Sequence, residues 1–478
     1  MEDTHSDNRR LFAGACAAIC ALAFSFAALS GIMYQLKGAF LLDNGQIGLI
    51  GGAGLWGMAV SQIGFSSLCD AFGMRNLMRL AALGHIAGVA LIVSASGFTG
   101  LFVGALVLAI ANGMVEAVCN PLIATLYKER KAAMLNRLHL WFPGGIVISG
   151  LILWTMAGLD WRWMMAIVVP PTLLYTWLFT GPRFPATEAA EAGARLGDAF
   201  RAVGTTPIFW LFLGLMAITM SLELGPNRWI PAVLEAGGMH GILVLVLING
   251  VMAIARGNAH TILDRVSPVV LLCVSAATAG LGLLWLSYAS GLAQTIAAAL
   301  VFAIGISMVW PTMMGFVAER TPKTGALGLG LMAAAGSLAV GLVTTPLLGT
   351  IADRHLPQAI EAAPARALTE QVVSAPAADP KLRAEAQAIL AAPQLPEATG
   401  DFLRRVAADQ TNGPAARAAA ELLHPAENRS GLLAFRYLVP FALLVSLIFA
   451  LVALRDRRTG GYAAAVERAR FQQGAPEQ

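Results

Sequence analysis

Residues 11–36 read LFAGACAAICALAFSFAALSGIMYQL and contain no Asp, Glu, Lys or Arg. About 20 apolar residues in a helix cross the hydrocarbon core of a bilayer. The run is too long for the apolar core of a secretory signal, and the preceding MEDTHSDNRR carries charges of both signs. It therefore predicts a first membrane-spanning helix.

The composition extends this prediction to the whole chain. Of 478 residues, 57% are hydrophobic and 13% charged, whereas a soluble domain has about 25% charged residues. The mean hydropathy is +0.68. These values predict an all-α integral membrane protein. We find no basic stripe, phosphate-binding glycine loop, Ser-His-Asp spacing or metal-type cysteine spacing, so we expect no nucleic-acid partner, no metal, no cofactor and no enzyme activity.

The apolar runs number about twelve and divide into six, a linker and six. The runs lie near residues 11–36, 46–67, 77–96, 100–126, 134–158, 163–181, 207–230, 241–262, 268–289, 293–317, 325–349 and 432–455. The expected parts are a first six-helix bundle (1–181), a linker (182–206), five helices of a second bundle (207–350), an insertion (351–431), and a last helix with a tail (432–478).

Basic residues indicate the orientation, because Lys and Arg in short loops favour the cytoplasm. With the N-terminus inside, the cytoplasmic segments hold most of the Lys and Arg, and the opposite loops hold few, such as Lys37 and Arg162. We therefore expect both termini in the cytoplasm and the chain in the cell (inner) membrane. The insertion at 351–431 then lies outside. Its stretches DPKLRAEAQAILAAPQ and ATGDFLRRVAADQ predict short amphipathic helices, which either pack as a cap or serve gating or a partner.

Charged turns follow the second span of each half. Asp70 and Arg75 flank Gly73 in one half, and the other half has Arg256 and Asp264 at the equivalent position. Such charges are ordinary in loops, but their recurrence favours latches between helix ends.

The stretch SLCDAFGMR and the six-plus-six pattern resemble the major facilitator superfamily. That family's usual motif is Gly-x-Leu-Ala-Asp-Arg-x-Gly-Arg-Arg, from which Ser66, Ala71 and Met74 depart. The resemblance covers nearly the whole chain except 351–431. It implies the major facilitator fold, with a transport site between two six-helix halves.

A second stretch resembles the fucose–galactose–glucose/proton symporter branch of that family. Its pattern is a Glu, an Asn-Pro and a Leu-Asn, matched here by Glu116, Asn120, Pro121, Leu135 and Asn136. The resemblance implies that Glu116 belongs to the proton and sugar site and that His139 occupies the position of a sugar-binding Gln.

The first span departs from that branch, which carries an essential Asp there. The corresponding region here offers Tyr34 and Gln35 but no acid before Asp43. The two-carboxylate site of the fucose permeases is therefore incomplete, which argues against fucose itself as the substrate.

Glu116 also stands out without any family. A charged residue at a helix centre costs about 2.5–3.5 kcal/mol on insertion scales, so such residues usually line a bundle interior or an aqueous cavity. A carboxyl in such surroundings can exchange a proton near neutral pH. Asn120 lies one turn along the same face. The alternative is a structural hydrogen bond between helices; we expect Glu116 to carry the proton.

Further candidate residues lie in the second half. Glu223 falls towards the outer end of the seventh span, where Gly225 and Pro226 can break the helix. Asn227 and Trp229 add an amide and an aromatic face, the combination that binds sugars. Trp229 can equally be an interfacial anchor.

Two residues have strong structural alternatives. Trp310 precedes Pro311 in the tenth span, and a tryptophan there is commonly a core residue. His139 can be an interfacial polar residue, or it can relay protons near Glu116.

These residues together predict a secondary transporter that moves a small polar solute with protons by alternating access. A monosaccharide importer acting as a monomer in the lipid bilayer is the first expectation. The alternatives are a proton-coupled exporter of drugs or metabolites, and a nutrient sensor that transports nothing and signals through the 351–431 loop.

Overall fold

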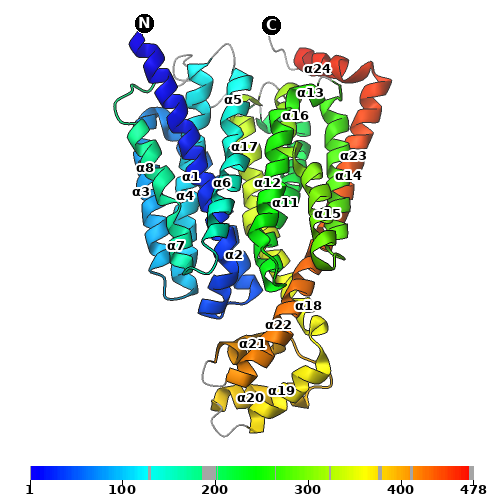
Figure 1. Cartoon of the computed structure of the whole chain (residues 1–478). Helices are drawn as coiled ribbons and strands as arrows, with labels where there is room; N and C mark the ends of the chain where they lie inside the picture. Colours follow the sequence, from blue (N-terminus) through cyan, green and yellow to red (C-terminus); the bar gives the residue numbers. More distant parts are fainter. Residues whose placement is uncertain are drawn as a thin grey trace.

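The computed structural model describes residues 2–127, 131–185, 201, 203–263, 265–321, 324–374, 379–409 and 413–472. Throughout these residues the regular structure is helical and no strand occurs. Figure 1 shows a bundle of long helices with both termini at one end and a smaller group of helices at the other. We call these the terminal end and the cap end.

The first half of the bundle is built from the helices that precede the linker. They are α1 (Glu2–Phe40), α2 (Asn44–Phe72), α3 (Met74–Val93), α4 (Phe98–Leu126), α5 (Lys131–His139), α6 (Trp141–Thr155), α7 (Trp161–Ala166) and α8 (Val169–Leu178). Helix α4 packs against α2 and α3, while α1 packs against α6 and α8. Most of the expected linker, residues 186–200 and 202, lies outside the described residues.

The second half begins at α11, which starts with a proline at its first position, where the missing N–H costs nothing. Helix α14 packs against α15 and α23, and α11 packs against α17. The helices are α11 (Pro207–Ala236), α12 (Gly241–Gly257), α13 (Ala259–Leu263), α14 (Pro268–Leu286), α15 (Gly291–Ile306), α16 (Val309–Arg320), α17 (Gly325–Leu338), the π-helix η3 (Ala339–Thr344), α18 (Thr345–Ala359), α23 (Val439–Arg458) and α24 (Gly461–Gln472).

Ten helical segments of the described chain are long and apolar enough to cross a membrane. Two other expected spans fall short of that length: the stretch 163–181 is broken into α7 and α8, and α12 has 17 residues. Large apolar side chains such as Leu83, Trp163 and Leu281 are exposed on the bundle surface, as a lipid-facing surface requires. The prediction of an all-α, multi-pass membrane protein is confirmed.

The insertion forms a compact cap at one end of the bundle (Figure 1). It contains α19 (Ala362–Ser374), α20 (Pro380–Ala391), α21 (Thr399–Ala408) and α22 (Gly413–Ala434), and the short helix η4 (Phe435–Leu438) leads from it into α23. Both expected short helices are present, as α20 and α21. Leu368, Ile389, Phe402 and Leu423 belong to a core of the cap's own, which Leu356 extends into α18. The cap is therefore a packed unit continuous with two bundle helices.

The two halves are in close contact towards the cap end. A Cβ atom at Gly52 of α2 would lie 2.1 Å from the carbonyl oxygen of Gly341 in η3, and one at Gly48 would lie 2.7 Å from that of Thr345. These approaches are possible only because glycine has no side chain. The glycines of GQIGLIGGAGLWG, residues 45–57, thus allow α2 to pack closely against η3 and α18.

Candidate functional site

A cavity of about 60 Å³ lies between the two halves in the middle of the bundle. Helices α1, α2, α4, α5 and α6 line it from the first half, and α11, α12, α16 and α17 line it from the second. Its wall is formed by Leu22, Phe26, Gly54, Leu55, Met58, Gln62, Asn112, Glu116, His139, Phe142, Met220, Glu223, Leu224, Arg256, Trp310 and Ser337. A mostly apolar wall with a few converging polar groups is typical of a small-molecule site.

Glu116 of α4 reaches this cavity, and Gln62 of α2 donates a hydrogen bond from Nε2 to its Oε2. No lysine or arginine pairs with Glu116 in the part of the chain that the structure describes. The Oε1 atom of Gln62 is buried and has no hydrogen-bond partner. The pair therefore offers a carboxyl group without a counter-ion and an amide oxygen that still lacks a donor.

Glu223 and Arg256 form a buried ion pair on the opposite wall, with 3.0 Å between Glu223 Oε1 and Arg256 Nη2. Arg256 also donates from Nε to the carbonyl of Ser307, while Oε2 of Glu223 is buried without a partner. Arg256 therefore lies in the cavity and not in a helix-end latch. The last turn of α12, where it sits, faces inwards.

The expected break of the seventh span is absent, and this changes the position of Glu223. Helix α11 continues through Pro226 and Pro231 to Ala236. Packing against α1, α17 and η3 holds the helix together across these prolines. Glu223 consequently lies near the middle of the span, on the cavity wall, and not towards its outer end.

His139 and Asn120 are brought together at the terminal side of the cavity. Nε2 of His139, the last residue of α5, lies 2.9 Å from Oδ1 of Asn120 in α4. His139 lines the cavity wall, and so does Trp310 of α16. The side chain of Asn136, predicted to join them, lies outside the described residues.

The remaining predicted binding residues lie between the central cavity and the cap end. Tyr34 and Trp229 line a second, smaller cavity of about 20 Å³, and Trp229 donates from Nε1 to the carbonyl of Thr345. Gln35 lies against Met164 of α7. Asn227 is buried and donates to the carbonyl of Glu223.

The turn between α2 and α3 is centred on Gly73. Gly73 has φ +76°, a backbone conformation that glycine adopts readily and other residues rarely do. Arg75 donates to the carbonyl oxygens of Gly181 and Pro182, just after α8, and so ties the turn to the end of the first half. The side chain of Asp70 and the whole of Asp264 lie outside the described residues.

Sequence reasoning missed a buried polar network behind the cavity. Asn112 lines the wall and bonds to Ser25 and to Nε2 of His85, and Nδ1 of His85 lies 3.0 Å from the hydroxyl of Tyr175. The side chains of this hydrogen-bonded series satisfy one another, and this holds Asn112 in place. The available signal was the occurrence of Asn and His inside apolar spans.

The reasoning from the sequence also missed Arg228, although this residue lies only five positions after Glu223. Arg228 is 2% exposed and extends from α11 to α1 of the first half. An arginine in an apolar span was again the available signal.

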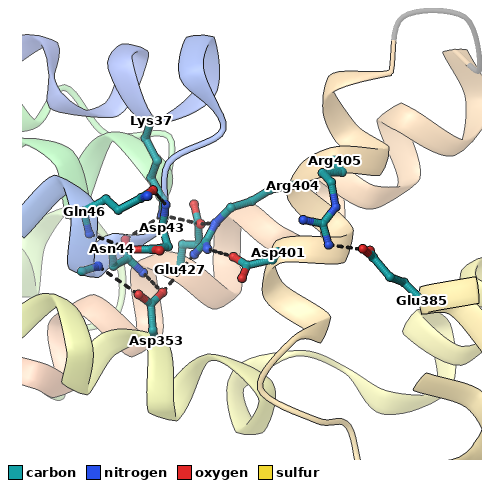
Figure 2. Close-up of polar contacts among 11 residues, drawn as sticks. Lys37, Asp43, Asn44, Gln46, Asp353, Glu385, Asp401, Arg404, Arg405 and Glu427 are labelled. Carbon is teal, nitrogen blue, oxygen red and sulfur yellow. Dashed lines mark hydrogen bonds and ion pairs between the residues drawn. The ribbon is translucent and has the colours of Figure 1, made fainter. Parts of the chain in front are cut away.

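A second cluster of charged groups joins the cap to both halves (Figure 2). Lys37 of α1 contacts Glu427 of α22, with 2.5 Å between Nζ and Oε1, and donates to Asn44 at the start of α2. Asn44 in turn donates to Asp353 of α18. Arg404 of α21 donates to Glu427, Asp353 and Asp401.

Each charge in this cap-end network has a partner of opposite sign. Burial alone would lower the pKa of Arg404, but the carboxylates of Glu427 and Asp353 raise it above its ordinary value. Asp43 accepts from the backbone N–H of Gln46 and so caps the start of α2, next to the network. The network therefore holds the first half, the second half and the cap together at this end.

Comparison with known proteins agrees with this architecture. A structure of a D-xylose-proton symporter matches with a TM-score of 0.62 at 16% identity, over 72% of this chain and 90% of the other. A bacterial homologue of the human lysosomal transporter Spinster, in an inward-facing and occupied conformation, gives 0.65 at 16% identity, over 92% and 97%. The Escherichia coli fucose:proton symporter gives 0.53 at 15% identity, over 91% and 98%. At these identities the matches show the fold.

Sequence comparison gives a weaker relative and a family. A glucose transporter of Staphylococcus epidermidis is 26% identical over 182 residues, which span 34% of this chain and 40% of that protein. The model of the Major Facilitator Superfamily matches residues 13–355. The chain therefore belongs to the Major Facilitator Superfamily.

Proposed function

We propose that this protein is a proton-coupled secondary transporter of a small polar solute, a monosaccharide or a derivative of one. The supporting observation is the central cavity, where Glu116 has an amide partner but no cation. A carboxyl group without a counter-ion can take up and release a proton without separating an ion pair. The names of the xylose, fucose and glucose transporters above support the solute class.

The wall also fits a hydroxyl-rich solute. Oε1 of Gln62 and Oε2 of Glu223 are buried without donors, and a hydroxyl group can donate to each of them. Trp310 provides an aromatic face beside them, against which the C–H groups of a sugar ring pack well. A free polar oxygen on each half lets one solute contact both halves at once.

The position of this cavity between the halves supports transport by alternating access. A cavity of about 60 Å³ holds only a few water molecules, so a monosaccharide requires the halves to move apart. In the present state the halves are packed at the cap end by α2, η3 and α18. We propose that the cap end faces the outside, the termini face the cytoplasm, and the transporter works as a monomer in the inner membrane.

Accumulation in proteoliposomes under an imposed pH gradient tests the proposal. Labelled monosaccharides and their derivatives are screened with the wild type and with Glu116→Gln. We expect gradient-driven accumulation in the wild type, and in the variant only exchange of solute across the membrane. Glu235→Gln is the matched control, because Glu235 lies outside the cavity wall and accepts a hydrogen bond from the backbone N–H of Gly241.

Other results assign the protein differently. Accumulation by Glu116→Gln at the wild-type level would exclude Glu116 as the proton carrier. Solute movement opposite to the proton flow would indicate an exporter, and tight binding without any flux would indicate a sensor.

A further inference from the structure

Arg228 is buried between the two halves of the transporter. Its Nη1 donates to the carbonyl of Phe26 at 3.0 Å and to the hydroxyl of Ser30 at 3.1 Å, both in α1. Its guanidinium carbon lies 4.0 Å from the centre of the Phe26 ring. These partners are all uncharged, and the Nε atom of Arg228 has no hydrogen-bond acceptor.

Among the described residues Arg228 therefore has no carboxylate in direct contact, unlike the other buried cations described above. Lys37 pairs with Glu427, Arg256 with Glu223, and Arg404 with three carboxylates. No Asp or Glu pairs with Arg228 in the described parts of the chain. An unpaired charge inside a membrane protein is costly and usually marks a solute or ion pathway.

Arg228 lies next to the wall of the central cavity. Phe26, Gly54 and Leu224 line that cavity, and Nη2 of Arg228 would lie 3.1 Å from a Cβ atom at Gly54. Along α11, Leu224 lines the central cavity, Arg228 follows one turn later, and Trp229 lines the smaller cavity at the cap end. A solute passing between the two cavities passes Arg228.

We infer that the solute carries one negative charge, a carboxylate on a polyhydroxy skeleton such as a uronic or aldonic acid, and that Arg228 binds this carboxylate. The inference rests on the proposed transport function and specifies its substrate class. Guanidinium and carboxylate groups form strong, often bidentate, charge-assisted hydrogen bonds. The free Nε supplies one donor, and displacement of the Phe26 ring brings the guanidinium face into the cavity.

The charge balance explains how the proton and the anion are coupled. The Glu223–Arg256 pair is neutral, so an ionised Glu116 and a charged Arg228 leave the buried site with no net charge. Protonation of Glu116 then leaves one positive charge, which a monoanion cancels. For this reason, binding of the proton makes the free energy of binding of the anion more favourable, and binding of the anion does the same for the proton.

Matched pairs of neutral and acidic solutes test this inference in proteoliposomes with a pH gradient. The solutes are glucose, glucuronate, gluconate and glucose 6-phosphate, and the proteins are the wild type, Arg228→Gln and Arg228→Lys. We expect the wild type to accumulate glucuronate or gluconate in preference to glucose and the phosphate. A hydrogen bond to a charged group contributes about 1.5–3 kcal/mol, so we expect Arg228→Gln to raise the KM for the acid by roughly 10- to 150-fold. Arg228→Lys should recover part of that loss.

The wild type alone decides the substrate class, whether or not the variants fold. Accumulation of glucose without its acids overturns the inference and leaves the proposed function standing. Preferred accumulation of glucose 6-phosphate overturns the assignment to a carboxylate. Acid accumulation that does not depend on the pH gradient supports the inference but overturns proton coupling, and an unchanged KM in a folded Arg228→Gln overturns the role of Arg228.

Discussion

Two clusters of buried charge lie on either side of the closed cap-end contact, and they differ in how their charges are paired. In the cap-end network Lys37 and Arg404 share Glu427, and Asp353 is held by Arg404 and Asn44 (Figure 2). Around the central cavity, among the described residues, only Glu223 and Arg256 are paired, while Glu116 and Arg228 have uncharged partners. Full pairing suits a contact that holds parts together, whereas incomplete pairing leaves groups available to a proton and a solute.

The largest expected effect is on stability, from Glu427→Gln in the paired cluster. The change leaves Lys37 and Arg404 buried without their shared carboxylate. Removal of one partner from a buried pair costs about 3–5 kcal/mol. Thermal unfolding in detergent measures this loss.

Glu385→Gln is the matched control for that experiment. Glu385 pairs with Arg405 in the same cap, but both side chains are more than 40% exposed. An exposed pair contributes at most about 1 kcal/mol, so we expect little change in the melting temperature. Equal melting temperatures for the two variants would contradict the stabilising role of the network.

A double-mutant cycle measures the interaction between Glu223 and Arg256, the ion pair in the cavity. Glu223→Gln and Arg256→Met each leave one buried charge unpaired, whereas the double variant leaves none. We therefore expect the double variant to be more stable than the sum of the single losses predicts, by about 0.5–3 kcal/mol. Thermal unfolding of the wild type, the two single variants and the double variant measures the stabilities. If the losses of the single variants simply add up in the double variant, the two side chains do not interact.

Packing at the cap end is tested by Gly52→Ala. The new Cβ atom collides with the carbonyl oxygen of Gly341, and overpacking costs about 1–3 kcal/mol. The ratio of molecules closed at the cap end to molecules open there then falls by about 5- to 150-fold. Hydrogen exchange over residues 37–52 should become faster.

The control for this packing test is Gly64→Ala in the same helix. A Cβ atom at Gly64 has no neighbour within 4 Å, so exchange should stay unchanged. Faster exchange in both variants would indicate a general loosening of α2 and not an opening of the cap end.

The smallest expected effect is that of His139→Gln. A glutamine amide can still bond to Asn120, so we expect uptake to fall by at most about tenfold, the equivalent of one neutral hydrogen bond. His139→Leu removes that bond and should be the more damaging change. Equal uptake by both variants would show that the bond to Asn120 is irrelevant.

The candidate site could be predicted only in part. The four candidates Glu116, Glu223, His139 and Trp310 line one cavity, and their roles in binding stay predictions. Tyr34 and Trp229 were placed in the same site, but the course of α1 and α11 puts them closer to the cap end. A residue's depth along a span depends on where the helix ends, and Pro226 does not end α11.

The sequence by itself determined the class of the protein, the positions of its apolar spans and the short helices of the insertion. These properties are local, because hydropathy over about 20 residues decides whether a segment crosses a membrane. Only the tertiary structure decided which charges are paired. Lys37 and Glu427 are 390 positions apart, and Arg228 lacks a carboxylate because the neighbours that α1 and α2 bring to it are uncharged. Pairing depends on which helices pack together, and that depends on the whole bundle.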